Sequence, residues 1–322
     1  MRLNDTDPND TSAAPDVPRV SIVIPVFNKV ELTRACLESL ARHTPRGLAE
    51  ILVVDNGSTD GTAAYLAGLG PRVRVLRNAK NRGFARACNR GAHAALAPDV
   101  LFLNNDTEAH AGWLEPLLAV LDADPRVVAV GSRLLFPDGT LQHAGVLITE
   151  DRRDPALLVP RHVHYAEPGA LAEANRRRCY QALTAACLLV RKRAFEQAGG
   201  FDDGYWNGYE DVDLCLRLRQ QGGWLVYEPA SVLTHHESKS GPERFTRRAE
   251  NVQRLFERWY RRVELDAVVD PKGRFMWTES MQIRDYVLPA PGVPAAVAPG
   301  RVAGRVSLVI LTFNQLECTQ QC

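Results

Sequence analysis

The residues of this chain that could take part in chemistry follow short apolar runs. The clearest run covers residues 100–103 and ends in Asn104-Asn105-Asp106. In an open α/β sheet, ligands bind beyond the carboxyl ends of the strands, and a carboxylate there can hold a hard cation that in turn binds phosphate oxygens. The same residues also suit a strand followed by a helix N-cap, because residues 113–121 form an amphipathic stretch. These residues alone leave both interpretations open.

Two further polar groups lie nearer the N-terminus. Asp55 ends the apolar run 51–55, and its carboxylate could accept a hydrogen bond from a base or a ribose hydroxyl, or only start a turn. Asn81-Arg82-Gly83 opens a helical pattern, where free N–H groups favour phosphate, but it also suits an ordinary helix start. The first strand is not followed by a P-loop motif or by Gly-x-Gly-x-x-Gly, which argues against a P-loop enzyme and a dinucleotide dehydrogenase.

Two polar clusters occur in the second half of the chain. Glu210-Asp211-Val212-Asp213 begins a predicted helix, where the helix dipole favours acids. Aromatic residues at 205, 206 and 209 support a second interpretation, since aromatic faces beside carboxylates often hold a sugar ring. His235-His236 ends a predicted strand and suits a metal ligand, a general base or a histidine without a chemical role.

Strands and helices alternate through the first third of the chain. Apolar strands are predicted over residues 19–28, 51–55, 73–76 and 100–103, with residues of helical spacing after each. This alternation indicates βαβ units, a mainly parallel sheet and the α/β fold class. Because the carboxyl ends of parallel strands share one edge, we expect the polar residues that follow them to converge on one cleft.

The pattern changes after residue 127. We predict strands over 127–135, 141–148, 180–190, 224–227 and 232–234, helices over 193–198 and 210–221, and a mobile loop over 149–178. Residues 242–262 form a basic amphipathic helix. We favour a helix packed on the domain with a solvated basic face, and the alternative is peripheral contact with an anionic membrane surface.

Charge and cysteine usage exclude several classes of protein. The 39 basic and 38 acidic residues give a net charge of +1, so no overall field favours nucleic acid. We find no signal-peptide pattern and no apolar run near the ~20 residues that span a bilayer. The 7 cysteines are dispersed without a Cys-x-x-Cys pair, which predicts reduced thiols and a cytoplasmic location.

The end of the chain repeats its first predicted strand. Residues 288–304 have linker composition, and residues 305–322 match residues 19–36 at 10 of 18 positions. This predicts the start of a second domain with the same fold, and two unrelated Val- and Ile-rich strands are the alternative. The expected organisation is a disordered tail over 1–18, one domain over 19–265, an extension and linker over 266–304, and a truncated second domain over 305–322.

The motifs and their order resemble glycosyltransferase family 2, whose members have the GT-A fold. The resemblance covers residues 19–262 and rests on Val-Ser-Ile-Val-Ile-Pro-Val-Phe-Asn28, Val-Val-Asp55-Asn-Gly-Ser-Thr-Asp-Gly, Asn81-Arg-Gly-Phe-Ala-Arg-Ala-Cys-Asn89, Leu-Asn104-Asn-Asp106, Tyr209-Glu-Asp-Val-Asp and His235-His236. It implies a Rossmann-like, mainly parallel central sheet flanked by helices, with a small mixed subregion on the acceptor side. The pattern is most similar to bacterial rhamnosyl- and galactofuranosyltransferase-like enzymes of surface polysaccharide synthesis.

The resemblance also implies roles for individual residues. Asp211 would be the general base, and Asp106 with His235 would hold Mg²⁺ or Mn²⁺, with His236 as the second choice. Asn104-Asn105-Asp106 takes the place of the family's Asp-x-Asp motif. Residues near the nucleotide would be Val26, Asn28, Asp55, Asn81, Asn89 and Asn105. Trp206 and Glu210 would lie near the acceptor.

The function that follows is inverting transfer of a sugar from a nucleoside-diphosphate sugar to a hydroxyl of a glycan or lipid-linked acceptor, in cell-surface polysaccharide synthesis. The expected partners are that donor, that acceptor and a second glycosyltransferase domain, and not nucleic acid. Two alternatives are a sugar-nucleotide nucleotidyltransferase and a non-catalytic nucleotide-sugar or carbohydrate-binding module. The first normally has a Gly-rich basic loop after the first strand, which Pro25-Val26-Phe27-Asn28 is not.

Overall fold

Four parallel strands and the helices between them form the N-terminal part of the molecule. The computed structural model describes residues 17–154, 157–236, 246–279 and 283–289, and structural statements below concern these residues. The strands lie in the order β4-β1-β2-β3 and all pair in parallel. Their bounds are β1 Val20–Val26, β2 Ala49–Asp55, β3 Val73–Arg77 and β4 Asp99–Leu103. The helices between them are α1 Val30–His43, α2 Thr62–Ala67 and α3 Phe84–Ala94. The predicted alternation of strands and helices is confirmed.

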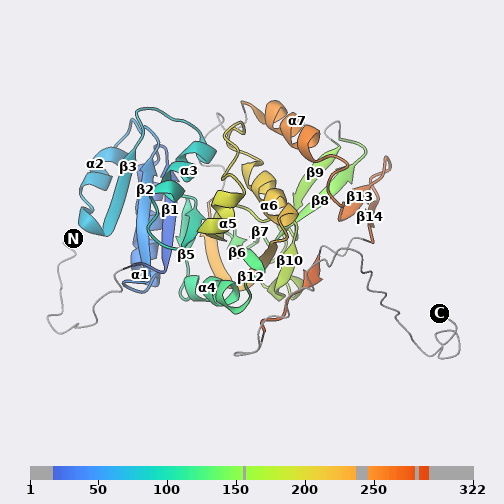
Figure 1. The fold of residues 1–322 in the computed structure, drawn as a ribbon, viewed down its shortest axis with the longest axis horizontal. Helices are drawn as coiled ribbons and strands as arrows, with labels where there is room; N and C mark the ends of the chain where they lie inside the picture. Colours follow the sequence, from blue (N-terminus) through green and yellow to red (C-terminus); the bar gives the residue numbers. More distant parts are fainter. Residues whose placement is uncertain (1–16, 155–156, 237–245, 280–282, 290–322) are drawn as a thin grey trace, which may run out of the picture. The chain divides into compact units, whose positions relative to one another are not determined.

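Apolar side chains cover both faces of this sheet because the strands contain almost uninterrupted apolar runs. Alternate residues of a strand point to opposite faces. In β4, Phe102 packs into a core with α3, while Leu101 and Leu103 pack into a second core with α1. Helices on both faces (Figure 1) are the arrangement that parallel sheets require.

The same sheet continues to eleven strands in its second half, where the strand directions are mixed. The order is β15-β10-β12-β6-β11-β4-β1-β2-β3, with β5 on β12 and β7 on β6. β11 is antiparallel to both β4 and β6, and β12 is parallel to β6. The bounds are β5 Thr107–Ala109, β6 Val127–Leu135, β7 Leu141–His143, β10 Arg178–Tyr180, β11 Cys187–Arg191, β12 Trp224–His235 and β15 Arg284–Asp285. The helices are α4 Leu114–Ala123, α5 Lys192–Gln197 and α6 Glu210–Gln220.

A second, four-stranded sheet has the order β14-β13-β8-β9. Its strands are β8 Val146–Asp151, β9 Leu158–His162, β13 Ala267–Val269 and β14 Phe275–Trp277. The prediction of a mobile loop over 149–178 is therefore wrong. That stretch holds the end of β8, all of β9, a 3₁₀ turn at Glu173–Asn175 and the start of β10. These strands were missed because they are short and because β8 pairs with residues more than a hundred positions away.

Three smaller predictions also need correction. Residues 141–148 are not one strand, because β7 pairs with β6 in the large sheet and β8 belongs to the second sheet. Residues 180–190 are not one strand, because the chain leaves the sheet after β10 and returns at β11, and the residues between line a cleft. Residues 224–227 and 232–234 belong to the single strand β12, whose pairing with β6 shifts register between Glu228 and Val232. The sequence pattern broke at Pro229, where the register shift allows a strand to continue.

Helix α7, Arg248–Trp259, packs on the domain through Asn251, Leu255 and Trp259, which confirms the favoured interpretation of that stretch. The part of the predicted helix 242–262 that precedes residue 246 lies outside the described residues. Most of the predicted N-terminal tail and the predicted second domain also lie outside them. The predicted domain boundaries therefore stay predictions. No helix in the described part of the chain is long and apolar enough to cross a membrane.

Candidate active site

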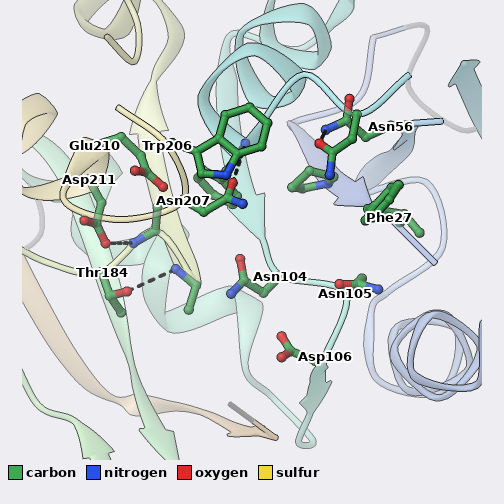
Figure 2. A pocket seen from close by; sticks show the side chains of 16 residues that line it. Phe27, Asn56, Asn104, Asn105, Asp106, Thr184, Trp206, Asn207, Glu210 and Asp211 are labelled. Carbon is green, nitrogen blue, oxygen red and sulfur yellow. Dashed lines mark hydrogen bonds between the residues drawn. The ribbon is translucent and has the colours of Figure 1, made fainter. Parts of the chain in front are cut away.

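A first cleft lies at the carboxyl ends of β1, β2 and β4. Its walls come from residues just beyond those strands, from the start of α3, from residues 184–186 and from the start of α6 with the loop before it. Figure 2 shows Glu210 and Asp211 on one side of this cleft, Phe27 and Asn56 on the other, and Asn104 with Asp106 between them. Seven predicted site residues line it: Val26, Asn81, Asn105, Asp106, Trp206, Glu210 and Asp211.

Asp106 and His235 meet at this edge of the sheet because β5 pairs with the end of β12. Oδ1 of Asp106 lies 3.1 Å from Nε2 of His235, and both side chains are buried. Nδ1 of His235 lies 3.2 Å from Oε1 of Gln142, which orients the ring. Burial opposes the ionisation of Asp106, but the hydrogen bond and charge of His235 outweigh it and keep the pKa of Asp106 below its usual value.

This pair fits a divalent cation. If Nδ1–H of His235 donates to Gln142, then Nε2 and the Asp106 carboxylate are both acceptors, and a cation between them would satisfy both. Without a cation, Nδ2 of Asn104, which lies 3.3 Å from Nε2, can donate to it. Two neighbouring ligands of an octahedral ion, each about 2.1 Å from it, lie about 3 Å apart, which matches the separation in the structure. In the described residues, no group of three or more His, Cys, Asp or Glu side chains could hold a metal. The other ligands would therefore be substrate or water oxygens.

The neighbouring histidine has a different environment. Nε2 of His236 lies 2.7 Å from Oε1 of Glu108, and neither residue lines the first cleft. The geometry therefore favours His235 over His236 as the partner of Asp106.

Asp211 is held by backbone amides but remains partly exposed. Its Oδ2 accepts a hydrogen bond of 3.1 Å from the N–H of Ala185, and its Oδ1 accepts one of 2.9 Å from the N–H of Val212. A dashed line in Figure 2 marks the hydrogen bond from the N–H of Ala185 to Asp211. Asp211 also lines a second cleft, which contains His235 and Arg248. Because the Asp211 carboxylate faces both clefts, it is positioned to take a proton from a molecule in the second cleft while that molecule reacts with one in the first cleft.

Glu210 differs from Asp211 because it is buried. Its Oε2 accepts a hydrogen bond of 2.6 Å from the N–H of Gly208. Burial, followed by the charge of Asp211, raises the pKa of Glu210 to about 8. Glu210 is therefore mostly protonated at neutral pH and can donate a hydrogen bond into the first cleft.

The raised pKa of Glu210 predicts a pH-dependent stability. The pKa of Glu210 in the folded state lies above the ordinary 4.5. Its contribution to the free energy of unfolding is therefore fully present below pH 4.5 and is lost as the pH rises to about 8. The loss is at most about 1.4 kcal/mol per pH unit. Glu210→Gln should remove this dependence, so that the variant gains stability relative to the wild type between pH 5 and pH 8. Urea unfolding at four pH values measures the difference, and a constant difference would show that Glu210 titrates normally.

On the opposite side of the cleft, asparagine side chains join the loop after β2 to the loop between β3 and α3. Nδ2 of Asn56 donates to Oδ1 of Asn81 at 2.8 Å. Oδ1 of Asn56 accepts hydrogen bonds from Nδ2 of Asn78 at 2.8 Å and from the N–H of Arg82 at 3.1 Å. Asn56 therefore fixes the chain between β3 and α3. Sequence reasoning gave Asn56 no role of its own, so this residue was missed.

Asp55 lies at the end of β2, outside the residues that line the first cleft. Its Oδ1 accepts a hydrogen bond of 2.9 Å from the N–H of Ser58. Its Oδ2 is buried and has no hydrogen-bond partner, although Nε of Arg77 lies 3.5 Å away. An unsatisfied buried carboxylate oxygen is costly, and it leaves an acceptor free for an N–H group.

Three predicted nucleotide contacts have structural partners. Oδ1 of Asn28 accepts from the N–H of Thr59 at 2.7 Å, so its side chain ties the end of β1 to the loop after β2. Asn89 pairs with both backbone polar groups of Phe201 and does not line the first cleft. Asn105 lines the cleft while Nδ2 donates to Oγ1 of Thr33 at 3.0 Å. Of these three side chains, only Asn105 faces the cleft.

Trp206 and Asn207 close the upper part of the cleft in Figure 2. Oδ1 of Asn207 accepts from the N–H of Phe84 at the start of α3, and Asn251 of α7 holds both backbone groups of Trp206. A Cβ on Gly83 would lie 3.1 Å from the indole, and the positive φ of Gly83 also favours glycine. Trp206 and Glu210 line the first cleft and not the second, so they face the same space as Asn81.

Asp213, the third acid of the cluster, has a structural position. Its fully buried carboxylate accepts hydrogen bonds from Nε of Arg217 (2.8 Å), Nη1 of Arg258 (2.9 Å) and Nε1 of Trp259 (2.9 Å). Arg258 also pairs with Asp202 at 2.9 Å, and Arg254 pairs with Asp202 at 3.2 Å. Arg254 and Arg258 therefore connect α7 to the domain and are not free for an anionic surface.

We expect Asp213→Ala to lower the free energy of unfolding by about 3–5 kcal/mol, because it leaves a buried cationic network without its acceptor. Urea unfolding measures the loss. The matched control is Asp203→Ala, which removes an exposed ion pair with Arg86 and should cost less than about 1 kcal/mol. Equal losses in the two variants would contradict this assignment.

Comparisons with known proteins agree with this architecture. A sequence model described as "Glycosyl transferase family 2" matches residues 21–178. The chain is 33% identical over 220 residues to N-acetylglucosaminyl-diphospho-decaprenol L-rhamnosyltransferase of Mycobacterium tuberculosis, which covers 63% of this chain and 71% of that protein. It is 35% identical over 228 residues to the O-antigen biosynthesis protein RfbC of Myxococcus xanthus, covering 69% of this chain and 18% of that protein. The chain spans less than a third of the length of two of the curated relatives that it matches.

Solved structures support the same fold. The mannosyltransferase PcManGT of Pyrobaculum calidifontis, in complex with GDP-Man and Mn²⁺, superposes with a TM-score of 0.56 and 21% identity. The alignment covers 77% of this chain and 66% of that chain. The likeness shows a GT-A fold, which confirms the predicted fold class.

Proposed function

Because this chain belongs to glycosyltransferase family 2, we propose that it transfers a sugar, with inversion, from a nucleoside-diphosphate sugar to a hydroxyl of a glycan or lipid-linked acceptor. The observation that carries this proposal is that Asp106, His235 and Asp211 all line the second cleft, while Asp106 and Asp211 also line the first cleft. Relatives with roles in O-antigen and lipid-linked glycan synthesis support a role in cell-surface polysaccharide synthesis.

The donor would lie in the first cleft. Its base and ribose would approach the loops after β1 and β2, where Oδ2 of Asp55 is an unsatisfied acceptor. Its diphosphate would lie beside Asp106, and its sugar would lie beside Trp206 and Glu210. These two residues would then contact the acceptor where it meets the donor sugar. An indole face and a protonated carboxyl group suit a sugar, because one packs on C–H groups and the other donates a hydrogen bond.

Asp106 and His235 would hold Mg²⁺ or Mn²⁺ together with oxygens of the donor. When bound, the cation would offset negative charge that develops on the departing diphosphate. The Mn²⁺ complex of the structural neighbour PcManGT supports this assignment. Two protein ligands alone predict weak metal binding before the nucleotide arrives.

The acceptor would enter through the second cleft. Asp211 would take the proton of the acceptor hydroxyl while that oxygen forms a bond to the anomeric carbon. The bond from the anomeric carbon to the phosphate oxygen breaks, and its electron pair leaves with the nucleoside diphosphate. Attack from the face opposite the leaving group inverts the anomeric configuration.

Product analysis separates this proposal from the two alternatives. A glycosyltransferase releases a nucleoside diphosphate from a sugar nucleotide. A nucleotidyltransferase instead releases pyrophosphate from a nucleoside triphosphate and a sugar 1-phosphate, and a binding module releases neither. We expect only nucleoside diphosphate, and release of pyrophosphate alone would overturn the proposal.

Peripheral contact with the inner face of the plasma membrane through residues 242–262 remains a further proposal. The ion pairs of Arg254 and Arg258 with Asp202 reduce the basic surface that would support it. A cytoplasmic location and a second glycosyltransferase domain are likewise proposals.

A further inference from the structure

The side chain of Asn104 is free to rotate, although its backbone is fixed. Asn104 lines both clefts, as Asp106 does. Its N–H donates to the carbonyl oxygen of Ala186 at 3.0 Å, and its own carbonyl oxygen accepts from Oγ1 of Thr107 at 2.7 Å. The side chain is partly exposed, and among the described residues its only hydrogen-bond partner is His235. The carboxamide can therefore turn without disturbing the backbone that carries it.

The contact between Asn104 and His235 competes with a cation. Nδ2 of Asn104 lies 3.3 Å from Nε2 of His235, which is long for a hydrogen bond. When Nδ1–H of His235 donates to Gln142, Nε2 carries one lone pair. That lone pair can accept an N–H of Asn104 or bind a cation, but not both. Binding of a cation at Nε2 therefore requires the amide N–H of Asn104 to turn away.

Rotation of the same carboxamide replaces a donor with an acceptor. The NH₂ group and the carbonyl oxygen of an asparagine are nearly equal in size, so a half turn places Oδ1 where Nδ2 is now. Oδ1 of Asp106 and Nδ2 of Asn104 lie 3.1 and 3.3 Å from Nε2 of His235. Both separations are close to the spacing of about 3 Å between neighbouring ligands of an octahedral ion. After rotation, Oδ1 of Asn104 can take one of the ligand positions otherwise left to water, since amide oxygens bind hard divalent cations.

We propose that Asn104 is a switchable metal ligand. In the free protein its N–H binds Nε2 of His235, and in the donor complex its Oδ1 faces the cation. A neutral amide adds no negative charge to the carboxylate of Asp106, so the diphosphate has to supply the remaining charge. The free protein is therefore a poor metal binder, and the metal binds with the sugar nucleotide and leaves with the nucleoside diphosphate. This inference rests on the proposed function and deepens the account of its metal site.

Binding of Mn²⁺ without nucleotide tests the free state, and it is measured by the electron paramagnetic resonance signal of free Mn²⁺. Asn104→Asp cannot donate to Nε2 of His235 and offers the cation a second carboxylate. We expect it to bind Mn²⁺ at least about tenfold more tightly than the wild type, because the number of charged ligands tunes metal affinity over orders of magnitude. Addition of His235→Ala should remove most of this gain, because the two side chains would act on the same ion.

Binding of a nucleoside diphosphate tests the loaded state. Asn104→Leu has neither a donor nor an acceptor in its side chain. In this variant, the tightening of nucleotide binding by Mn²⁺ should be about tenfold smaller than in the wild type, since loss of even an indirect partner of a metal typically costs tenfold or more. Titration calorimetry in Mn²⁺ and in EDTA measures the difference.

Asn105→Asp is the matched control. It adds the same charge at the next residue, which lines the first cleft but hydrogen-bonds to Thr33. It should tighten Mn²⁺ binding less than about threefold, because a charge that does not touch the ion is screened by solvent. Equal gains in Asn104→Asp and Asn105→Asp, no gain in Asn104→Asp, or an unchanged Mn²⁺ effect in Asn104→Leu would overturn the inference. If the wild type still releases nucleoside diphosphate in a Mn²⁺-dependent manner, only the inference fails; if it does not, the proposed function fails as well.

Discussion

Asp211→Asn is expected to lower the rate of sugar transfer by about 10²–10⁴, the usual contribution of a positioned general base. The amide oxygen of the asparagine can still accept the hydrogen bond from the N–H of Ala185, and only the contact with the N–H of Val212 is lost. The fold and the first cleft should therefore remain intact. Binding of the sugar nucleotide should therefore change little. Transfer is measured as initial rates of nucleoside diphosphate release at saturating acceptor, and donor binding by titration calorimetry.

The control for this variant is Asp203→Asn, a nearby acid that pairs with Arg86 and lines neither cleft. It should retain wild-type turnover. Near-full turnover in Asp211→Asn would contradict the assignment of Asp211 as the general base. Loss of donor binding together with turnover would instead show that Asp211 acts on the donor.

Asp106→Ala is expected to abolish the effect of Mn²⁺ on nucleotide binding. In the wild type, Mn²⁺ should tighten binding of the nucleoside diphosphate by about a hundredfold or more, because charge stabilisation by a bound metal amounts to several kcal/mol. In Asp106→Ala, the affinity in Mn²⁺ should fall to the affinity in EDTA. His235→Ala should reduce the same difference, since it removes the second proposed ligand.

The neighbouring Glu108 and His236 provide a matched control. They form a carboxylate–histidine pair of 2.7 Å at the same place, where β5 pairs with the end of β12, but do not line either cleft. Glu108→Ala and His236→Ala should keep the full Mn²⁺ effect. An unchanged Mn²⁺ effect in Asp106→Ala, or its loss in His236→Ala, would contradict the proposed metal pair.

The sequence predicted the parallel half of the sheet well because its strands are buried on both faces. Runs such as residues 100–103 are apolar throughout, and the polar residues that follow them are at one edge by topology alone. The antiparallel and second-sheet strands were harder to predict. β13 and β14 have only three residues each, and β8, which pairs with β13, is far away in the sequence.

The site was predictable where a motif places one polar residue at a strand or helix end. Asp106 and Asp211 face the first cleft. Helical periodicity also explains why Asp213 does not, since residues two apart point to opposite sides of a helix. In contrast, the role of Asn56 depends on contacts with Asn78 and Asn81, which only the folded chain brings together. The role of Asn89, which hydrogen-bonds to the backbone of Phe201, also depends on a contact that only the folded chain brings together.

The central claim is transfer from a nucleoside-diphosphate sugar at a metal-dependent site. The most direct measurement is the rate of nucleoside diphosphate release by the wild-type protein across a panel of sugar nucleotides, in Mn²⁺ and then in EDTA. We predict release from one donor or a few related donors in Mn²⁺ and its loss in EDTA. Equal release in Mn²⁺ and EDTA, or no release from any donor in the presence of glycan and lipid-linked glycan acceptors, would contradict the claim.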